Sequence, residues 1–118
     1  MKLGILAGAG GAKIRINLDR IKHAENLGYD SVWTAEAWGG DAVTSAAWML
    51  AHTTRINVGT AIMQMPARTP AMAAMTAMSL AELSGGGLLR GWEHQAHRLL
   101  RAGMAYLMAN QSLDSKNM

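Results

Sequence analysis

Three side chains in the first half of the sequence belong to types that perform acid–base or nucleophilic chemistry: Glu36, Ser45 and His52. Glu36 lies near the end of an apolar segment, where a carboxylate could accept or donate a proton. Ser45 and His52 fall on one face of a single predicted helix. A serine hydroxyl becomes a nucleophile beside a base such as histidine, but no G-x-S-x-G turn exposes Ser45. If Ser45 and His52 take part in hydrolysis, we expect them to do so in a site that is assembled between subunits.

Residues that could bind a metal or a phosphate form weaker patterns. His94 and His97 share a helix face in the stretch EHQAH, but a zinc site needs three or four ligands and the sequence has no cysteine. The stretch GAGGA at residues 8–12 lacks the spacing of a G-x-G-x-x-G dinucleotide loop. We expect no metal site, and we interpret the glycines as a turn between a strand and a helix.

Short apolar segments alternate with helical periodicity through the first 86 residues. We predict strands at residues 3–7, 31–37 and 56–64, and helices within residues 13–28, 42–53 and 71–86. Asp41 is the expected N-cap of the second helix, Gly28 the expected end of the first, and Pro66 and Pro70 precede or open the third. This alternation indicates a parallel sheet with helical crossovers.

Active sites of parallel α/β folds lie at the carboxyl ends of the strands. Here those ends are residues 7–11, 34–38 and 60–65. Trp38 falls within the second of them, where it either lines a pocket or packs against its neighbours. Apolar side chains that we predict to lie in the core are Trp33, Trp48, Met72, Met75 and Met78.

Composition narrows the possible partners and locations. The chain has 118 residues, half of them apolar, with no cysteine and a net charge of +3. That length fits one modest core, and no apolar run reaches the roughly 18 residues needed to span a bilayer. The basic residues are scattered rather than clustered. We expect a cytoplasmic protein that binds neither nucleic acid nor membrane.

Two long stretches closely resemble the luciferase-like monooxygenase superfamily, and within it the deazaflavin-dependent oxidoreductases. They are GYDSVWTAEAWGGDAVT and HTTRINVGTAIMQMPARTPAMAAMTAMSLAELSGG. The resemblance covers residues 1–86. It implies an eight-stranded (β/α)8 barrel and hydride transfer to or from a deazaflavin or a flavin such as FMN.

The resemblance also implies roles for individual residues. Glu36 matches an acidic position near the cofactor ring, and Ala37 stands where related enzymes often carry histidine. A non-prolyl cis peptide that supports the ring in the family would fall at Ala61 and Ile62. With Trp38 at the same strand end, the candidate cofactor-binding residues are Glu36, Trp38, Ala61 and Ile62.

The sequence changes character after Gly86, where the family continues with another strand and a phosphate-binding loop. Residues 90–105 can be encoded by a set of synonymous codons that, when read from the third nucleotide, translates as GLGTPGPQVVEGWHG. This peptide resembles that loop. We therefore interpret residues 87–118 as an out-of-frame reading of a longer gene. The apolar spacing of residues 92–108 still predicts a C-terminal helix.

The predicted fold class is thus α/β: a partial (β/α)8 barrel of three β–α units in residues 1–86, with a helical tail over residues 87–118. Open sheet edges and the tail would complete it by forming a homo-oligomer. The leading functional hypothesis is a truncated flavin- or deazaflavin-dependent oxidoreductase with an incomplete cofactor site. An esterase-like hydrolase with an intersubunit site, which would take a small-molecule ligand, and a non-catalytic, self-associating fragment remain as alternatives.

Overall fold

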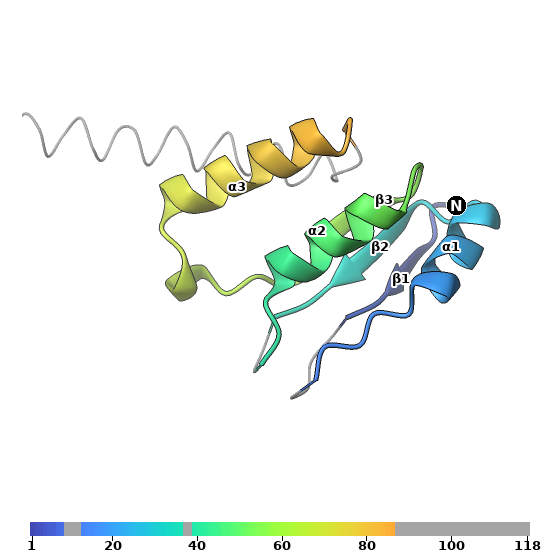
Figure 1. Ribbon diagram of the computed structural model, residues 1–118, viewed down its shortest axis with the longest axis horizontal. Helices are drawn as coiled ribbons and strands as arrows, with labels where there is room; N and C mark the ends of the chain where they lie inside the picture. Colours follow the sequence, from blue (N-terminus) through green and yellow to red (C-terminus); the bar gives the residue numbers. More distant parts are fainter. Residues whose placement is uncertain (9–12, 37–38, 87–118) are drawn as a thin grey trace, which may run out of the picture.

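The computed structural model describes residues 1–8, 13–36 and 39–86, which form a three-stranded sheet with helices (Figure 1). The parallel strands are β1 (Gly4–Leu6), β2 (Ser31–Thr34) and β3 (Asn57–Thr60), in the order β1-β2-β3. The α-helices are α1 (Leu18–Asn26), α2 (Ala42–His52) and α3 (Pro70–Leu83), and a short 3-10 helix, η1 (Met65–Ala67), precedes α3. The predicted α/β class with parallel strands is confirmed for this part of the chain. Trp38, His94, His97 and the predicted C-terminal helix lie outside the described residues.

The helix ends follow local sequence signals. Asp41 is the N-cap of α2, as predicted, and its carboxylate accepts the N–H of Thr44. Gly28 follows α1 with a φ of +83°, a backbone conformation that glycine adopts without a steric penalty. The N–H of Gly28 donates to the carbonyl oxygen of Glu25, and the N–H of Tyr29 donates to that of Ala24, so these two carbonyls near the end of α1 are satisfied.

The first helix occupies only the second part of the range predicted for it, residues 13–28. α1 begins at Leu18 because the side chain of Asn17 accepts the N–H of Arg20, at 3.0 Å, and so caps the helix there. The helical spacing of Ile14, Leu18 and Ile21 predicted that Ile14 belongs to this helix, but Ile14 precedes it and is 55% exposed. Ile16 packs against the core from the same pre-helical segment.

The main core lies between one face of the sheet and the first two helices. Its buried side chains come from all these elements: Ile21, Val32, Ala46, Met49, Ile56 and Val58. Figure 1 shows α2 lying across β2 and β3, with α3 beside α2. Ala74 and Ala77 of α3 pack against Val43 and Leu50 of α2 in a second cluster. Helices layered on a single face of a parallel sheet are the arrangement of a barrel, whose helices form an outer ring.

The other face of the sheet carries Trp33, which we had predicted to lie in the core. Its side chain is only partly buried, and its indole N–H donates to Ser31 Oγ at 3.0 Å. A Cβ on Gly4 of the neighbouring strand would lie 2.7 Å from Ser31 Oγ and 3.1 Å from Trp33 Nε1. Glycine at position 4 therefore makes room for this pair on the face opposite the helices.

The methionine stripe of α3 was also predicted wrongly. Met72, Met75 and Met78 are 57%, 62% and 48% exposed, and Trp48 of α2 is 53% exposed. The buried side of α3 is formed by alanines instead, namely Ala73, Ala74 and Ala77. No helix among the described residues is both long and apolar enough to cross a bilayer.

A buried carboxylate fastens α1 to the turn between α2 and β3. Glu25, at 8% exposure, accepts the main-chain N–H groups of Thr54, Arg55 and Ile56 on Oε1 at 2.8, 2.5 and 2.9 Å. Burial raises the pKa of Glu25, but these hydrogen bonds and the charge of Arg55 outweigh it and hold the pKa below its ordinary value. Glu25 is therefore ionised and structural, at the end of the sheet opposite the candidate site.

Candidate functional site at the carboxyl ends of the strands

The segments that follow β2 and β3 lie against each other. The N–H of Ala61 donates to the carbonyl oxygen of Thr34 at 2.7 Å, and the N–H of Glu36 donates to the carbonyl oxygen of Ile62 at 2.9 Å. These two bonds continue the pairing of β2 with β3 beyond the strands themselves. The structure thus brings together Glu36, Ala61 and Ile62, three of the residues singled out from the sequence.

The peptide bond between Ala61 and Ile62 is cis, at the position that the resemblance implied. The side chain of Ile62 is 74% exposed. The residue whose carbonyl oxygen accepts the Glu36 N–H therefore carries a solvent-exposed apolar side chain.

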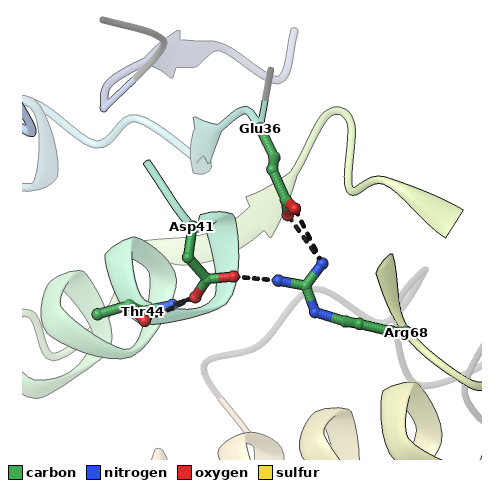
Figure 2. A network of polar contacts seen from close by, with 4 residues as sticks. All are labelled: Glu36, Asp41, Thr44 and Arg68. Atoms are coloured by element: carbon green, nitrogen blue, oxygen red, sulfur yellow. Dashed lines mark hydrogen bonds and ion pairs between the residues drawn. The ribbon is translucent and has the colours of Figure 1, made fainter. Parts of the chain in front are cut away.

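The carboxylate of Glu36 is held by Arg68, which lies between η1 and α3 (Figure 2). Arg68 Nη1 donates to both carboxylate oxygens of Glu36, at 3.1 and 2.9 Å. Both side chains are largely buried, with 11% of Glu36 and 17% of Arg68 exposed. Charged groups at such depth need a partner of opposite sign, and this pair supplies one.

The same guanidinium also reaches the start of α2. Arg68 Nη2 donates to Asp41 Oδ1, and Asp41 Oδ2 accepts the N–H and the hydroxyl of Thr44, each at 2.6 Å (Figure 2). Burial raises the pKa of Asp41, but the bonds from Thr44 and the positive charge of Arg68 outweigh it, so the pKa lies below its ordinary value. One arginine therefore joins the segments that follow β2 and β3 to the N-terminus of α2.

Arg68 was missed by the sequence analysis, although a signal for it existed. Between Arg55 and Arg90 it is the only lysine or arginine in the chain. An acidic side chain expected at a strand end needs a counter-charge, and this was the basic residue within reach of the third strand's end.

Ser45 and His52 both lie on α2, and the N–H of Ser45 donates to the main-chain carbonyl oxygen of Asp41 at 3.3 Å. Ser45 is 3% exposed and lies on a groove of about 680 Å³ whose lining residues are Ile14, Ile16, Thr44, Ser45, Ala47, Trp48 and Ala51. The Nδ1 atom of His52 forms a 2.8 Å hydrogen bond with the carbonyl oxygen of Trp48, and the two rings are 4.3 Å apart between centroids. Seven residues of α-helix span about 10 Å, so the fold separates Ser45 from His52 within one chain. A hydrolytic site between subunits stays a prediction.

Metal ligands do not converge in the described part of the chain. No three histidine, aspartate or glutamate side chains there lie close enough together to bind an ion. The chemistry available at the strand ends is instead that of a fixed carboxylate, an exposed apolar side chain and main-chain polar groups.

Comparison with known proteins places the chain in a family. The family described as luciferase-like monooxygenase matches residues 1–98, a range that continues past Gly86 into residues outside the described part. A protein of Mycobacterium tuberculosis, named "Putative coenzyme F420-dependent oxidoreductase Rv3520c", is 46% identical over 92 residues, which are 77% of this chain and 26% of that protein. The chain therefore spans about a quarter of that relative's length. From this match, and from the parallel sheet that carries its helices on one face, the chain belongs to the luciferase-like monooxygenase family.

Proposed function

We propose that this chain forms part of a deazaflavin-dependent oxidoreductase, with the ring of the cofactor bound at the carboxyl ends of β2 and β3. The observation that carries the proposal is the arrangement of Glu36 against Ile62, beside the cis peptide. The name of the M. tuberculosis relative supports a deazaflavin as the cofactor. FMN, which has a similar ring, is the alternative.

The residues at this end fit the ring of such a cofactor. A deazaflavin ring is planar, with apolar faces and an edge that carries hydrogen-bonding groups. Ile62, 74% exposed, offers an apolar contact for a face of the ring, and the Glu36 carboxylate offers acceptor sites for an N–H on its edge. Arg68 is already paired with two carboxylates, so we expect the phosphate-bearing tail to be bound by other residues.

The chemistry of the reaction would come from the cofactor. When bound, a deazaflavin supplies hydride transfer to or from a carbon atom of the substrate. In this proposal Glu36 binds the ring of the cofactor and orients it. Both oxygens of its carboxylate accept hydrogen bonds from Arg68, and each keeps a second lone pair for a ligand. Ile62 would shield one face of the ring from water, which favours transfer of a hydride.

A titration of the purified chain with a deazaflavin cofactor, followed by fluorescence and run in parallel with FMN, tests the proposal. We expect saturable binding in the micromolar range, with the deazaflavin bound more tightly than FMN. Absence of binding of either cofactor up to millimolar concentration would remove the oxidoreductase proposal.

We further propose that the described residues form only the part of the site that binds the ring of the cofactor. A second copy of the chain would complete the site. The open edges of β1 and β3 in the described sheet support this arrangement, since an unpaired strand edge invites another chain. Light scattering combined with the titration tests it. A monomer that binds the deazaflavin with micromolar affinity would contradict completion by a second copy.

A further inference from the structure

Residues 61–69, which connect β3 to α3, are fixed by polar bonds at both ends. At the start, the carbonyl oxygen of Ile62 accepts the main-chain N–H of Glu36. At the far end, Arg68 donates to the carboxylate of the same residue. Glu36 therefore binds this connection twice, once through its main chain and once through its side chain.

Most of the connection between β3 and α3 is not held in place by burial of apolar side chains. Ile62, Pro66 and Ala67 are exposed, while Met63 packs against the cluster between α2 and α3. Exposed side chains gain little free energy from contact with the fold. The polar bonds to Glu36, together with the bond from the Ala61 N–H to the carbonyl oxygen of Thr34, therefore help to align Ile62 with the end of β2.

An arginine at position 68 can pair with two carboxylates at once, which a lysine would do less well. Its planar guanidinium directs Nη1 at Glu36 and Nη2 at Asp41, so that one side chain neutralises two carboxylates from different segments. A lysine ammonium is a single charged point and cannot present two separated donors in one plane. Without a cation here, Glu36 and Asp41 would face each other as uncompensated negative charges.

We infer that Arg68 is the positioning residue of the proposed cofactor site: it acts through Glu36, whose carboxylate it orients and whose contact with Ile62 it stabilises. This inference rests on the proposed function for its effect on binding. Its effect on the geometry of Glu36 does not depend on any cofactor. The two can therefore be tested separately.

The first experiment compares Arg68→Met and Arg68→Lys with the wild type by amide hydrogen exchange of the free protein. Arg20→Met is the matched control, because Arg20 is an exposed arginine on α1. We expect the Glu36 amide to exchange about tenfold faster in Arg68→Met, by a smaller factor in Arg68→Lys, and at the wild-type rate in Arg20→Met. The Val32 and Val58 amides of the core strands should keep their protection in all of them. Unchanged exchange of Glu36 in Arg68→Met would overturn the inference, whether or not any cofactor binds.

The second experiment measures deazaflavin affinity in a double-mutant cycle. We expect Arg68→Met and Glu36→Gln each to weaken binding about tenfold, and the double variant to bind no more weakly than the weaker single variant. A residue that only stabilised the fold would give additive losses, and additivity would overturn the inference. If Arg68→Met does not fold, Arg68→Lys takes its place in the cycle with a smaller expected loss. Absence of binding by the wild type would count against the proposed function and leave the exchange result to judge Arg68.

Discussion

The main-chain N–H of Glu36 donates to the carbonyl oxygen of Ile62 at 2.9 Å, so the residue after the cis bond lies directly against the acidic residue after β2. Each of the two belongs to a segment that leaves the carboxyl end of its strand. Their contact extends the parallel pairing of β2 and β3 beyond the sheet. It also brings Ile62, whose apolar side chain is exposed, to the residue that carries the carboxylate, and the proposed ring site requires both.

The carboxylate of Glu36 should be needed for binding of the deazaflavin. We expect Glu36→Gln to weaken the affinity about tenfold, because the amide loses the negative charge and can turn only one oxygen toward Arg68 or the ligand. Glu82→Gln, a change of the same kind at an exposed position of α3, should bind within about twofold of the wild type. Fluorescence titration of both variants measures the difference, and equal affinities would exclude Glu36 from the site.

Asp41 has two separable roles, as the N-cap of α2 and as a partner of Arg68. We expect Asp41→Asn to lower the free energy of unfolding less than Asp41→Ala, since asparagine still caps a helix while alanine does not, a difference of about 1 kcal/mol. Asn17→Ala is the control, because Asn17 caps α1 through Arg20 N–H and Asn17 carries no charge. Chemical denaturation should show a larger loss for Asp41→Ala than for Asn17→Ala. The ion pair adds only a modest amount, because Asp41 is 39% exposed. Equal losses would mean that the bond to Arg68 contributes nothing to stability.

Features that depend on neighbouring residues could be predicted from the sequence. The N-cap at Asp41 and the helix end at Gly28 depend only on residues within four or five positions along the chain. Both were found where they were predicted. The parallel sheet followed from the alternation of segments. The cis bond at Ala61 and Ile62 was implied by the resemblance alone, because nothing in their residue types indicates it.

Features that depend on distant contacts could not be predicted in the same way. Arg68 and Glu36 are 32 positions apart, and their pairing exists only because β2 and β3 are neighbours in the sheet. The exposure of Met75 and Trp48 depends on which side of each helix meets the rest of the fold. Apolar residue type alone favoured burial of the methionines, whereas α3 packs through the side that carries Ala74 and Ala77.

The nucleotide sequence of the gene tests the interpretation of residues 87–118. We expect the codons of residues 90–105, read from their third nucleotide, to encode GLGTPGPQVVEGWHG or a close variant of it. That peptide would supply the phosphate-binding loop that the resemblance implies after the third β–α unit. A gene whose shifted frame encodes an unrelated peptide or an early stop codon would contradict the interpretation.

Glu25 should make the stability of the protein depend on pH in the acid range. Its pKa is lowered in the folded protein from an ordinary value of 4.5, so the folded state favours the ionised form. Its contribution is therefore fully present above about pH 5 and is lost as the pH falls below 4.5 through the pKa of the folded state. We expect Glu25→Gln to lower the free energy of unfolding by about 1–3 kcal/mol at pH 7, because the charge-assisted bonds to three N–H groups are weakened. The difference in the free energy of unfolding between the wild type and Glu25→Gln should become steadily smaller as the pH falls. Glu82→Gln is the control, and its free energy of unfolding should stay close to that of the wild type. Denaturation curves measured from pH 7 to pH 3 provide the test, and a gap that stays constant over this range would show that Glu25 is not the source of the acid sensitivity.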